Sequence, residues 1–234
     1  MSPARARAAA RVRLVRRIRP GTPRASAPGA RLTCVVLAAS EEEWVGVDVT
    51  SGALVRSPAG RADAFASVTP MDVIRFALAP GDGPADPARP EAVVPAEAPA
   101  RAGRLRPRRA RRLLARLAAP ERDGAPLLGA WGPSVAFVDL DGSHPSVVLV
   151  GVDRRGLTLQ CDRDQQSEAV LVWGGMPQRL PLRDPIALER VGGRRGRLEG
   201  GPLEGALGFR PAYAVVALGA VERGHARKEL LALL

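Results

Sequence analysis

The apolar residues of this chain are confined to short runs, and each run ends near Gly, Pro or Asp. Short runs that are rich in Val and bounded by turn-forming residues are typical of β-strands. They read RLTCVVLAA, EEWVGVDVT, GALVRS, VIRFALA, SVAFVDL, SVVLVGVD, GLTLQCD, AVLVWG and AYAVVALGAV, with IALERV as a weaker candidate. The sequence therefore predicts a mainly β protein of the α+β kind, in which helix is confined to a few segments.

Residues 105–120 carry a clear helical pattern, in a segment that is amphipathic and basic. Its apolar residues recur at the spacing of one helix face, and arginines occupy the remaining surface. The apolar positions are Ala110, Leu113, Leu114 and Leu117, and the arginines are Arg108, Arg109, Arg112 and Arg116. Pro107 suits the first turn of such a helix, and Pro120 ends it. A second, shorter helix is expected in the last residues, ARKELLALL.

Two pairs of segments resemble each other in the same order along the chain. WVGVDVTSGALVRS is similar to VLVGVDRRGLTLQC, which aligns Gly46 with Gly151. PMDVIRFALAPG is similar to LRDPIALERVGG, which aligns Asp72 with Asp184. The shared order favours a duplicated β unit. Chance is the alternative, because Val, Gly and Asp are common in this chain.

A chain of 234 residues suits two small domains as well as one large domain. Short strands with Gly-punctuated turns suggest two small β-barrels of the OB or SH3-like type, with the basic helix between them. The expected organisation is a basic arm at 1–30, disordered at least in part, a first barrel at 31–104, the helix at 105–120, and a second barrel with the terminal helix at 126–234. Residues 80–104 are rich in Pro, Ala and Gly and are expected to form a loop.

Positive charge is concentrated in two segments. Residues 1–30 and residues 101–116 each contain eight arginines and no acidic residue, while the whole chain carries +11, so the other residues together sum to −5. Such blocks suit phosphate-rich partners or anionic membrane surfaces. The alternative is a solvated tail and a solvated helix face that bind nothing.

The two cysteines and the hydropathy pattern indicate the cellular compartment and whether the chain enters a membrane. Cys34 and Cys161 lie in strand-like apolar runs and are expected to be reduced core residues, which favours the cytoplasm. No apolar run approaches the roughly 18 residues of a membrane span, and the N-terminus lacks the apolar core of a secretory signal. Membrane insertion is therefore not expected.

The stretch VAFVDLDGSHPSVVLV raises the question of catalysis, because Asp139 and Asp141 look like the nucleophile motif of haloacid dehalogenase-like phosphatases. That chemistry also needs a lysine and a second acidic pair for Mg²⁺, placed after a series of βα units. The single lysine is Lys228, and the runs after Asp141 read as strands with tight turns. Asp-Gly between apolar runs is a hairpin signal. The two aspartates are therefore predicted to form a turn.

Other catalytic and metal-binding patterns are missing from the sequence. His144 and His225 are the only histidines, and neither has ligand spacing to a cysteine. There is no phosphate-binding loop and no Gly-x-Ser-x-Gly elbow, and GGRRGRLEGG reads as a flexible basic loop. We expect no catalytic residue, no cofactor and no metal site.

The first half of the chain resembles the bacterial dual OB-fold domain proteins over residues 31–95. The similarity lies in WVGVDVTSGALVRS, where Arg56 follows the Gly52 turn, in the strand that begins at Asp72, and in RPEAV at Arg89–Val93. The aromatic residue that the family has near the arginine is absent, as is the polar pair that flanks Pro-Glu. The resemblance implies nucleic-acid binding and no catalysis.

Charge and resemblance together predict a non-catalytic nucleic-acid-binding protein, whose partner is single-stranded DNA or RNA held through its phosphates. The candidate binding residues are Arg56 and Arg75, which alternate with apolar neighbours, the helix arginines Arg108, Arg109, Arg112 and Arg116, the loop arginines Arg194 and Arg195, and Trp44 as a ring for base stacking. A core role is the more common one for such a ring, and this applies equally to Phe76 and Trp173.

Two alternatives belong to other functional classes. One is a protein–protein adaptor that binds no nucleic acid, in which the barrels and the RRLLARL helix dock on a partner protein. The other is an enzyme of a type that no motif reveals.

Overall fold

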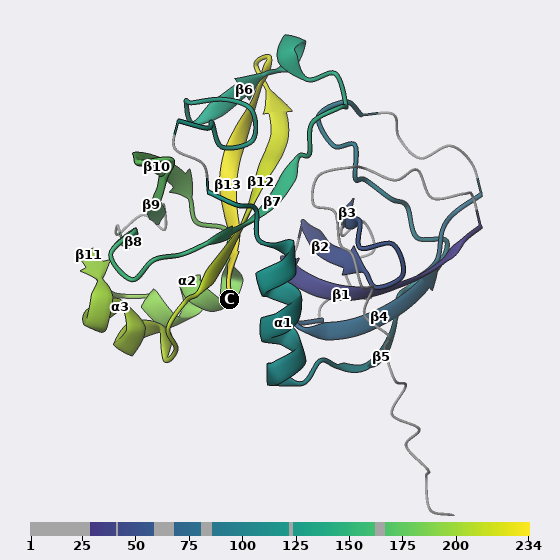
Figure 1. The fold of residues 1–234 in the computed structure, drawn as a ribbon, viewed down its shortest axis with the longest axis horizontal. Helices are drawn as coiled ribbons and strands as arrows, with labels where there is room; N and C mark the ends of the chain where they lie inside the picture. The colour runs from purple at the N-terminus through teal and green to yellow at the C-terminus, as the bar shows by residue number, and fades with distance from the viewer. Residues whose placement is uncertain (1–28, 41, 59–67, 81–85, 122–123, 162–166) are drawn as a thin grey trace, which may run out of the picture.

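The computed structural model describes residues 29–40, 42–58, 68–80, 86–121, 124–161 and 167–234. Their strands form three sheets that lie side by side (Figure 1), and every pair of neighbouring named strands is antiparallel. The prediction of a mainly β protein is confirmed. Residues 1–28, which are nearly all of the expected basic arm, lie outside the described residues.

The N-terminal sheet has the strand order β3-β2-β1-β4-β5. Its strands are β1 Arg31–Ala39, β2 Glu43–Asp48, β3 Leu54–Pro58, β4 Asp72–Ala77 and β5 Ala100–Arg104. One face of this sheet buries a core that includes Cys34, Trp44, Ile74 and Phe76. The opposite face buries a second core that includes Val35, Val47 and Val73. The same strands contribute to both cores because alternate residues of a strand point to opposite sides.

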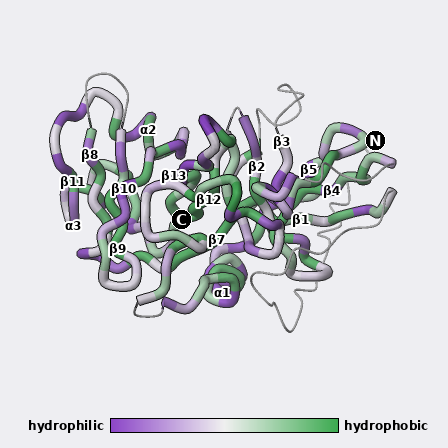
Figure 2. The backbone as a smooth tube through the Cα atoms, turned by 90° about the horizontal axis from the view of Figure 1, so that it is seen from above, coloured by the Kyte–Doolittle hydropathy of each residue, from purple (hydrophilic) through white to green (hydrophobic). Residues whose placement is uncertain are grey.

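Helix α1, Pro107–Leu117, follows β5 and packs its apolar residues into the second of these cores. Ala110, Leu113, Leu114 and Leu117 are buried, so the helix and its apolar face agree with the sequence pattern. Pro107 stands in the first turn, where a missing amide hydrogen is tolerated. Seen from above, α1 is viewed end-on and lies outside the sheets, at one side of the molecule (Figure 2).

The central sheet has the order β6-β13-β12-β7 and is buried on both faces. It contains β6 Ser134–Ala136, β7 Val147–Gly151, β12 Tyr213–Glu222 and β13 His225–Leu233, and the short 3-10 helix η2, Phe137–Asp139, follows β6. On β12, Val215 and Ala217 join the core shared with α1 and the N-terminal sheet, whereas Val216 and Leu218 join the core on the other side. A single sheet therefore ties the two halves of the chain together.

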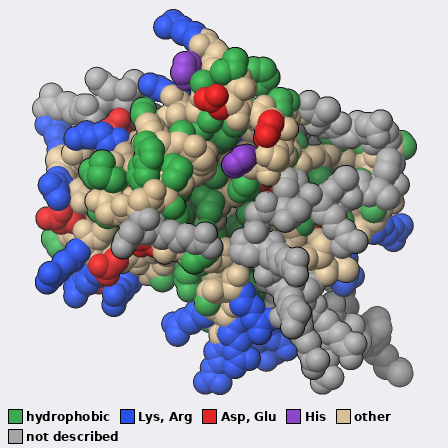
Figure 3. Space-filling model, turned by 45° about the horizontal axis from the view of Figure 1, so that its top comes forward, with side chains coloured by type: hydrophobic (Ala, Val, Ile, Leu, Met, Phe, Trp, Pro, Cys, Tyr) green, Lys and Arg blue, Asp and Glu red, His purple; other side chains and the backbone are tan. Residues whose placement is uncertain are grey.

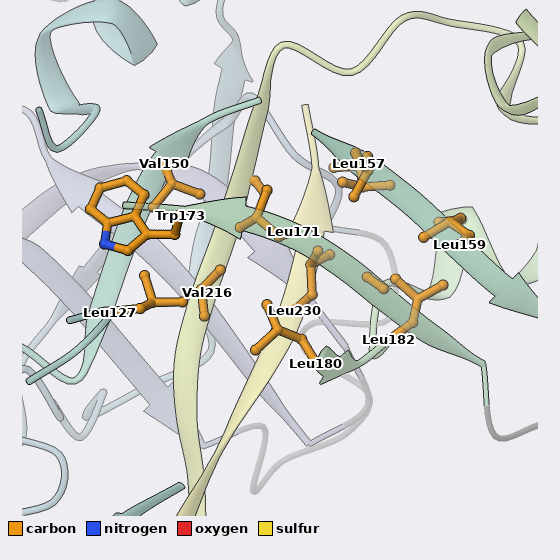
Figure 4. Close-up of a cluster of buried hydrophobic side chains, with 14 of the residues drawn as sticks. Leu127, Val150, Leu157, Leu159, Leu171, Trp173, Leu180, Leu182, Val216 and Leu230 are labelled. Carbon is orange, nitrogen blue, oxygen red and sulfur yellow. The ribbon is translucent and has the colours of Figure 1, made fainter. Parts of the chain in front are cut away.

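The lateral sheet has the order β10-β9-β8-β11 and covers the other face of the central sheet. Its elements are β8 Leu157–Cys161, β9 Glu168–Trp173, β10 Met176–Pro181, α2 Pro185–Val191, β11 Gly196–Glu199 and α3 Gly200–Leu207. Leu171 and Leu180 of this sheet lie beside Val216 and Leu230 of the central sheet (Figure 4).

The expected terminal helix is wrong, because ARKELLALL forms the strand β13. This strand pairs with β12 and β6 and is buried on both faces, with Leu230 in one core and Leu231 in the other. A strand buried on both faces reads as a continuous apolar run rather than an alternating one. Tertiary pairing therefore overrides the helix propensity of Ala, Lys, Glu and Leu.

Three other segments differ from their expected structure. Residues 80–104, which were expected to form a loop, end in strand β5. IALERV, the weak strand candidate, lies in helix α2. Its start is fixed by Asp184, whose carboxylate accepts hydrogen bonds from Ile186 N at 2.9 Å and Ala187 N at 3.0 Å. Asp followed by Pro is a helix-start signal that the strand interpretation ignored. The basic loop GGRRGRLEGG contains strand β11 and the first residues of α3.

The similar segments do not form equivalent elements. β2 and β3 pair with each other, whereas β7 and β8 belong to different sheets. The second match sets strand β4 against helix α2. Among the described residues, the strands form three antiparallel sheets, one of them a half-barrel, and an organisation into two barrels is not confirmed.

Candidate nucleic-acid interface

The exposed face of α1 is made of arginines. Arg108, Arg109, Arg111, Arg112 and Arg116 are all exposed, while the leucines of the same helix are buried. Figure 3 shows a dense group of basic side chains at the lower edge of the molecule, where Figure 1 places α1. The buried leucines fix the rotation of the helix, so its arginines must project into solvent.

The position of these arginines within α1 is unfavourable for the helix itself. The first turn contains Arg108 and Arg109 and no acidic residue, and the N-cap is Arg106, which makes no side-chain capping bond. The N-terminal end of a helix carries partial positive charge and is destabilised by cations. Arg108 and Arg112 also stand one turn apart, where like charges repel. An anion bound at this end would relieve both repulsions.

Strand β5 extends the positive surface, because it is an edge strand whose residues are all exposed. Arg101 and Arg104 of this strand both reach the buried carboxylate of Asp72 on β4. Their side chains keep about half of their surface in solvent, at 53% and 55% exposed.

Arg75 is exposed on β4 and stands opposite Ala100 in the pairing with β5, so it lies next to this edge. Arg194 and Arg195 are exposed in the connection between α2 and β11. That connection belongs to the part of the fold built around the lateral sheet, on the other side of the central sheet from α1 (Figure 1). Arg75 thus lies beside strand β5, whereas Arg194 and Arg195 form a second basic segment away from α1 and β5.

The alternation of Arg56 with apolar neighbours predicts a side chain that points away from the core, and this prediction is wrong because the side chain is 1% exposed. Its guanidinium forms a two-pronged ion pair with Glu43, with Nη2 2.7 Å from Oε1 and Nε 2.9 Å from Oε2. Nη1 donates to Ser146 Oγ at 3.1 Å and to the carbonyl oxygen of Leu218 at 2.9 Å. Alternation along β3 identified the face of Arg56 but not the central sheet that covers this face. Arg56 is therefore a structural residue and is not available to a nucleic acid.

The Pro-Glu segment joins the same buried network. The carboxylate of Glu91 accepts hydrogen bonds from Ser146 N at 2.8 Å and from Ser146 Oγ at 2.6 Å. The backbone of Arg56 pairs with this segment through Glu91 O and Val93 N. Arg56 and RPEAV, which the family resemblance singled out separately, thus meet at Ser146. No local pattern in the sequence marks Ser146 or Glu43 as a partner of Arg56.

The predicted stacking rings are core residues. Trp44 is fully buried and its ring meets that of Phe76 edge-on, with the ring centroids 5.4 Å apart. Trp173 is buried in the core between the central and lateral sheets (Figure 4). The ring of Trp44 is therefore not accessible for base stacking. The exposed large aromatic residues of the described chain are Trp131 and Phe137.

The leucine face of the RRLLARL helix is also unavailable for docking on a partner. Leu113, Leu114 and Leu117 pack against strands of the N-terminal and central sheets. The adaptor alternative therefore loses the apolar helix face on which it partly relied.

Asp139 and Asp141 do not form the expected hairpin. The strands on either side of them, β6 and β7, lie at opposite edges of the central sheet, with β13 and β12 between them. Asp141 instead closes a local turn, in which its Oδ1 accepts hydrogen bonds from Ser143 Oγ at 2.6 Å and Ser143 N at 2.8 Å. These hydrogen bonds lower the pKa of Asp141 to about 2. The turn is as predicted for Asp141, whereas Asp139 is the last residue of η2, and the hairpin is wrong.

Within the described ranges, no three side chains of His, Cys, Asp or Glu come together in a way that would hold a metal ion. The helices in these ranges are too short or too polar to cross a membrane. A scan of protein-family models and a search of curated proteins return no match to the chain.

Proposed function

We propose that this protein binds single-stranded nucleic acid without catalysis, through phosphate contacts made by the arginines of α1 and the adjoining β5 edge. The observation that carries the proposal is the placement of Arg108 and Arg109 in the first helical turn, with no acidic residue among them. Charges in that position destabilise the helix. A polyanionic partner that neutralises these charges would account for a surface that otherwise destabilises the helix.

The chemistry of arginine suits this partner. A guanidinium group presents several N–H donors in a planar fork, which matches the oxygens of a phosphate. Contacts of this kind position a nucleic acid without reading its bases. We therefore expect affinity that falls steeply with salt and depends little on sequence. Arg194 and Arg195 would add contacts for a longer strand.

The resemblance to dual OB-fold proteins supports the same function, and we propose that the sheets are related to such barrels. Cys34 and Cys161 are both free and buried, which suits a reducing compartment, and we propose the cytoplasm.

The direct test is a titration of labelled single-stranded oligonucleotides of different sequence with the full chain at low salt, followed by fluorescence anisotropy. The proposal predicts binding with similar affinity for each sequence. A folded protein that binds none of them would contradict the proposal and leave the adaptor alternative as the better account.

A further inference from the structure

Two guanidinium groups converge on one buried carboxylate at the edge of the N-terminal sheet. Nη2 of Arg101 lies 2.9 Å from Oδ1 of Asp72, and Nη1 of Arg104 lies 3.2 Å from the same oxygen. The other oxygen, Oδ2, accepts hydrogen bonds from Thr69 N at 3.0 Å and Thr69 Oγ1 at 3.1 Å. Asp72 is 0% exposed, so its carboxylate is enclosed by these donors.

A β-bulge brings the two arginines together. Arg101 and Arg104 are three positions apart, and residues at an odd spacing point to opposite faces of a regular strand. The pairing of β4 with β5 shifts register between Val73 and Ile74, because Gly103 stands opposite Val73 and Arg101 opposite Ile74. The extra residue restores both arginines to the side of Asp72. Gly103 has φ +151°, a conformation that favours glycine.

The arrangement leaves net positive charge and free donors at the surface. One carboxylate faces two guanidinium groups, and each guanidinium carries more N–H donors than Asp72 and Thr69 use. Because Asp72 is buried and already accepts four hydrogen bonds, it orients the arginines while remaining out of reach of a ligand.

We propose that Arg101 and Arg104 form a phosphate clamp, held in its binding geometry by Asp72 as a positioning residue. The inference rests on the proposed function, and it adds a specific contact for a backbone phosphate of the strand. Arg104 stands three positions before Pro107, the first residue of α1, so the clamp and the helix arginines belong to neighbouring segments of the chain. A guanidinium already held in place loses less side-chain freedom when it binds.

Substitution of Asp72 separates positioning from simple charge. The Asp72→Asn variant removes a negative charge beside the surface, so an account based on net charge alone expects tighter binding of a polyanion. The clamp predicts weaker binding, because the two arginines lose the group that orients them. The measurement is the affinity of the full chain for a labelled single-stranded oligonucleotide of mixed sequence at low salt. Affinity equal to or greater than that of the wild type in a folded Asp72→Asn variant would overturn the clamp.

Two further variants keep the test decisive if Asp72→Asn does not fold. Arg101→Gln/Arg104→Gln should flatten the plot of log affinity against log salt by about 1.4, from two lost phosphate contacts. Thr69→Val leaves every charge in place but removes the hydroxyl that lies 2.7 Å from Nη1 of Arg104, and it should also weaken binding. An unchanged slope in the first variant or unchanged affinity in the second would overturn the clamp.

The matched control is Arg179→Gln/Arg183→Gln, because these arginines are similarly exposed and also pair with carboxylates, on Glu168 and Glu229. The control should leave the slope unchanged. If the wild type binds and the α1 variants weaken binding while the Arg101/Arg104 variant does not, the clamp alone fails. If the wild type does not bind at all, the proposed function fails with it.

Discussion

Arg56 and Glu43 form a buried ion pair, in which Nη2 of the arginine lies 2.7 Å and 2.5 Å from the two carboxylate oxygens. The same guanidinium donates to Ser146 and to the carbonyl oxygen of Leu218, so it connects the N-terminal sheet to the central sheet. Loss of one partner leaves the other charge buried without compensation, which typically costs about 3–5 kcal/mol. Glu43→Gln and Arg56→Met should each lower the free energy of unfolding by this order, as measured by urea denaturation.

The double variant Glu43→Gln/Arg56→Met provides the control for this pair. Because each single change already breaks the same interaction, the double variant should be less destabilised than the sum of the two single changes. Strictly additive losses would show that the two side chains do not act as a pair.

The core beneath α1 is shared by the N-terminal and central sheets, so the protein should unfold in a single transition. Two separate transitions would contradict this shared packing.

A second prediction concerns the strain that the arginines place on α1. Arg108→Gln/Arg109→Gln should raise the free energy of unfolding by about 0.5–2 kcal/mol at low salt, because two cations are removed from the positive end of the helix. Gln and Arg have similar helix propensity, so the change isolates the charge. Chemical denaturation without nucleic acid measures the effect. Arg116, in the last turn, is favourably placed, so Arg116→Gln should not stabilise the protein. Stabilisation by Arg116→Gln that equals that of the double variant would refute the dipole argument.

A third prediction concerns pH. Lys228 is fully buried, its Nζ donates to the carbonyl oxygens of Ala130 and Gly132 at 2.6 Å, and burial lowers its pKa to about 8. Since the pKa of lysine in the unfolded chain is 10.5, this group contributes stability above pH 10.5 and loses it as pH falls through 8. From pH 8 to pH 10.5, the free energy of unfolding should therefore rise by a total on the order of 3 kcal/mol because of this group.

The comparison with Lys228→Met isolates this contribution. Burial raises the pKa of the Cys34 and Cys161 thiols, which opposes the trend, but it does so in both proteins and cancels in the difference. The free energy of unfolding of the wild type should rise relative to that of Lys228→Met from pH 7 to pH 10.5. A difference that stays constant over this range would show that Lys228 titrates normally.

The parts of the fold that the sequence predicts are those with a local periodic signal. Helix α1 follows from the spacing of Ala110, Leu113, Leu114 and Leu117, and strands β1 to β4 follow from apolar runs between turn residues. Strand β5 does not follow, because its sequence ARAGR contains no such run. Strand β13 does not follow, because its burial on both faces removes the alternation that marks a strand.

The candidate site divides in the same way. The exposure of Arg108, Arg109, Arg112 and Arg116 was predictable, because it depends on the helix to which they belong. The burial of Arg56 was not, since it depends on contacts with Ser146 and Leu218, which lie 90 and 162 positions later in the chain. For Arg101 and Arg104 the sequence showed only the positive charge. Their shared contact with Asp72 depends on a β-bulge, which has no signal in the sequence.

The most direct test of the central claim is the salt dependence of oligonucleotide binding for the variant Arg108→Gln/Arg109→Gln/Arg112→Gln/Arg116→Gln. The apolar face of α1 is untouched, so the helix should remain packed, which circular dichroism and thermal unfolding check. The control is Arg179→Gln/Arg183→Gln/Arg223→Gln/Arg227→Gln, which removes the same charge from exposed positions outside α1 and β5. With a single strand, the α1 variant should flatten the plot of log affinity against log salt by about 2.8, for four lost phosphate contacts, while the control keeps the wild-type slope. Equal slopes for the folded α1 variant and the wild type would mean that the α1 arginines are a solvated surface, and would contradict the account.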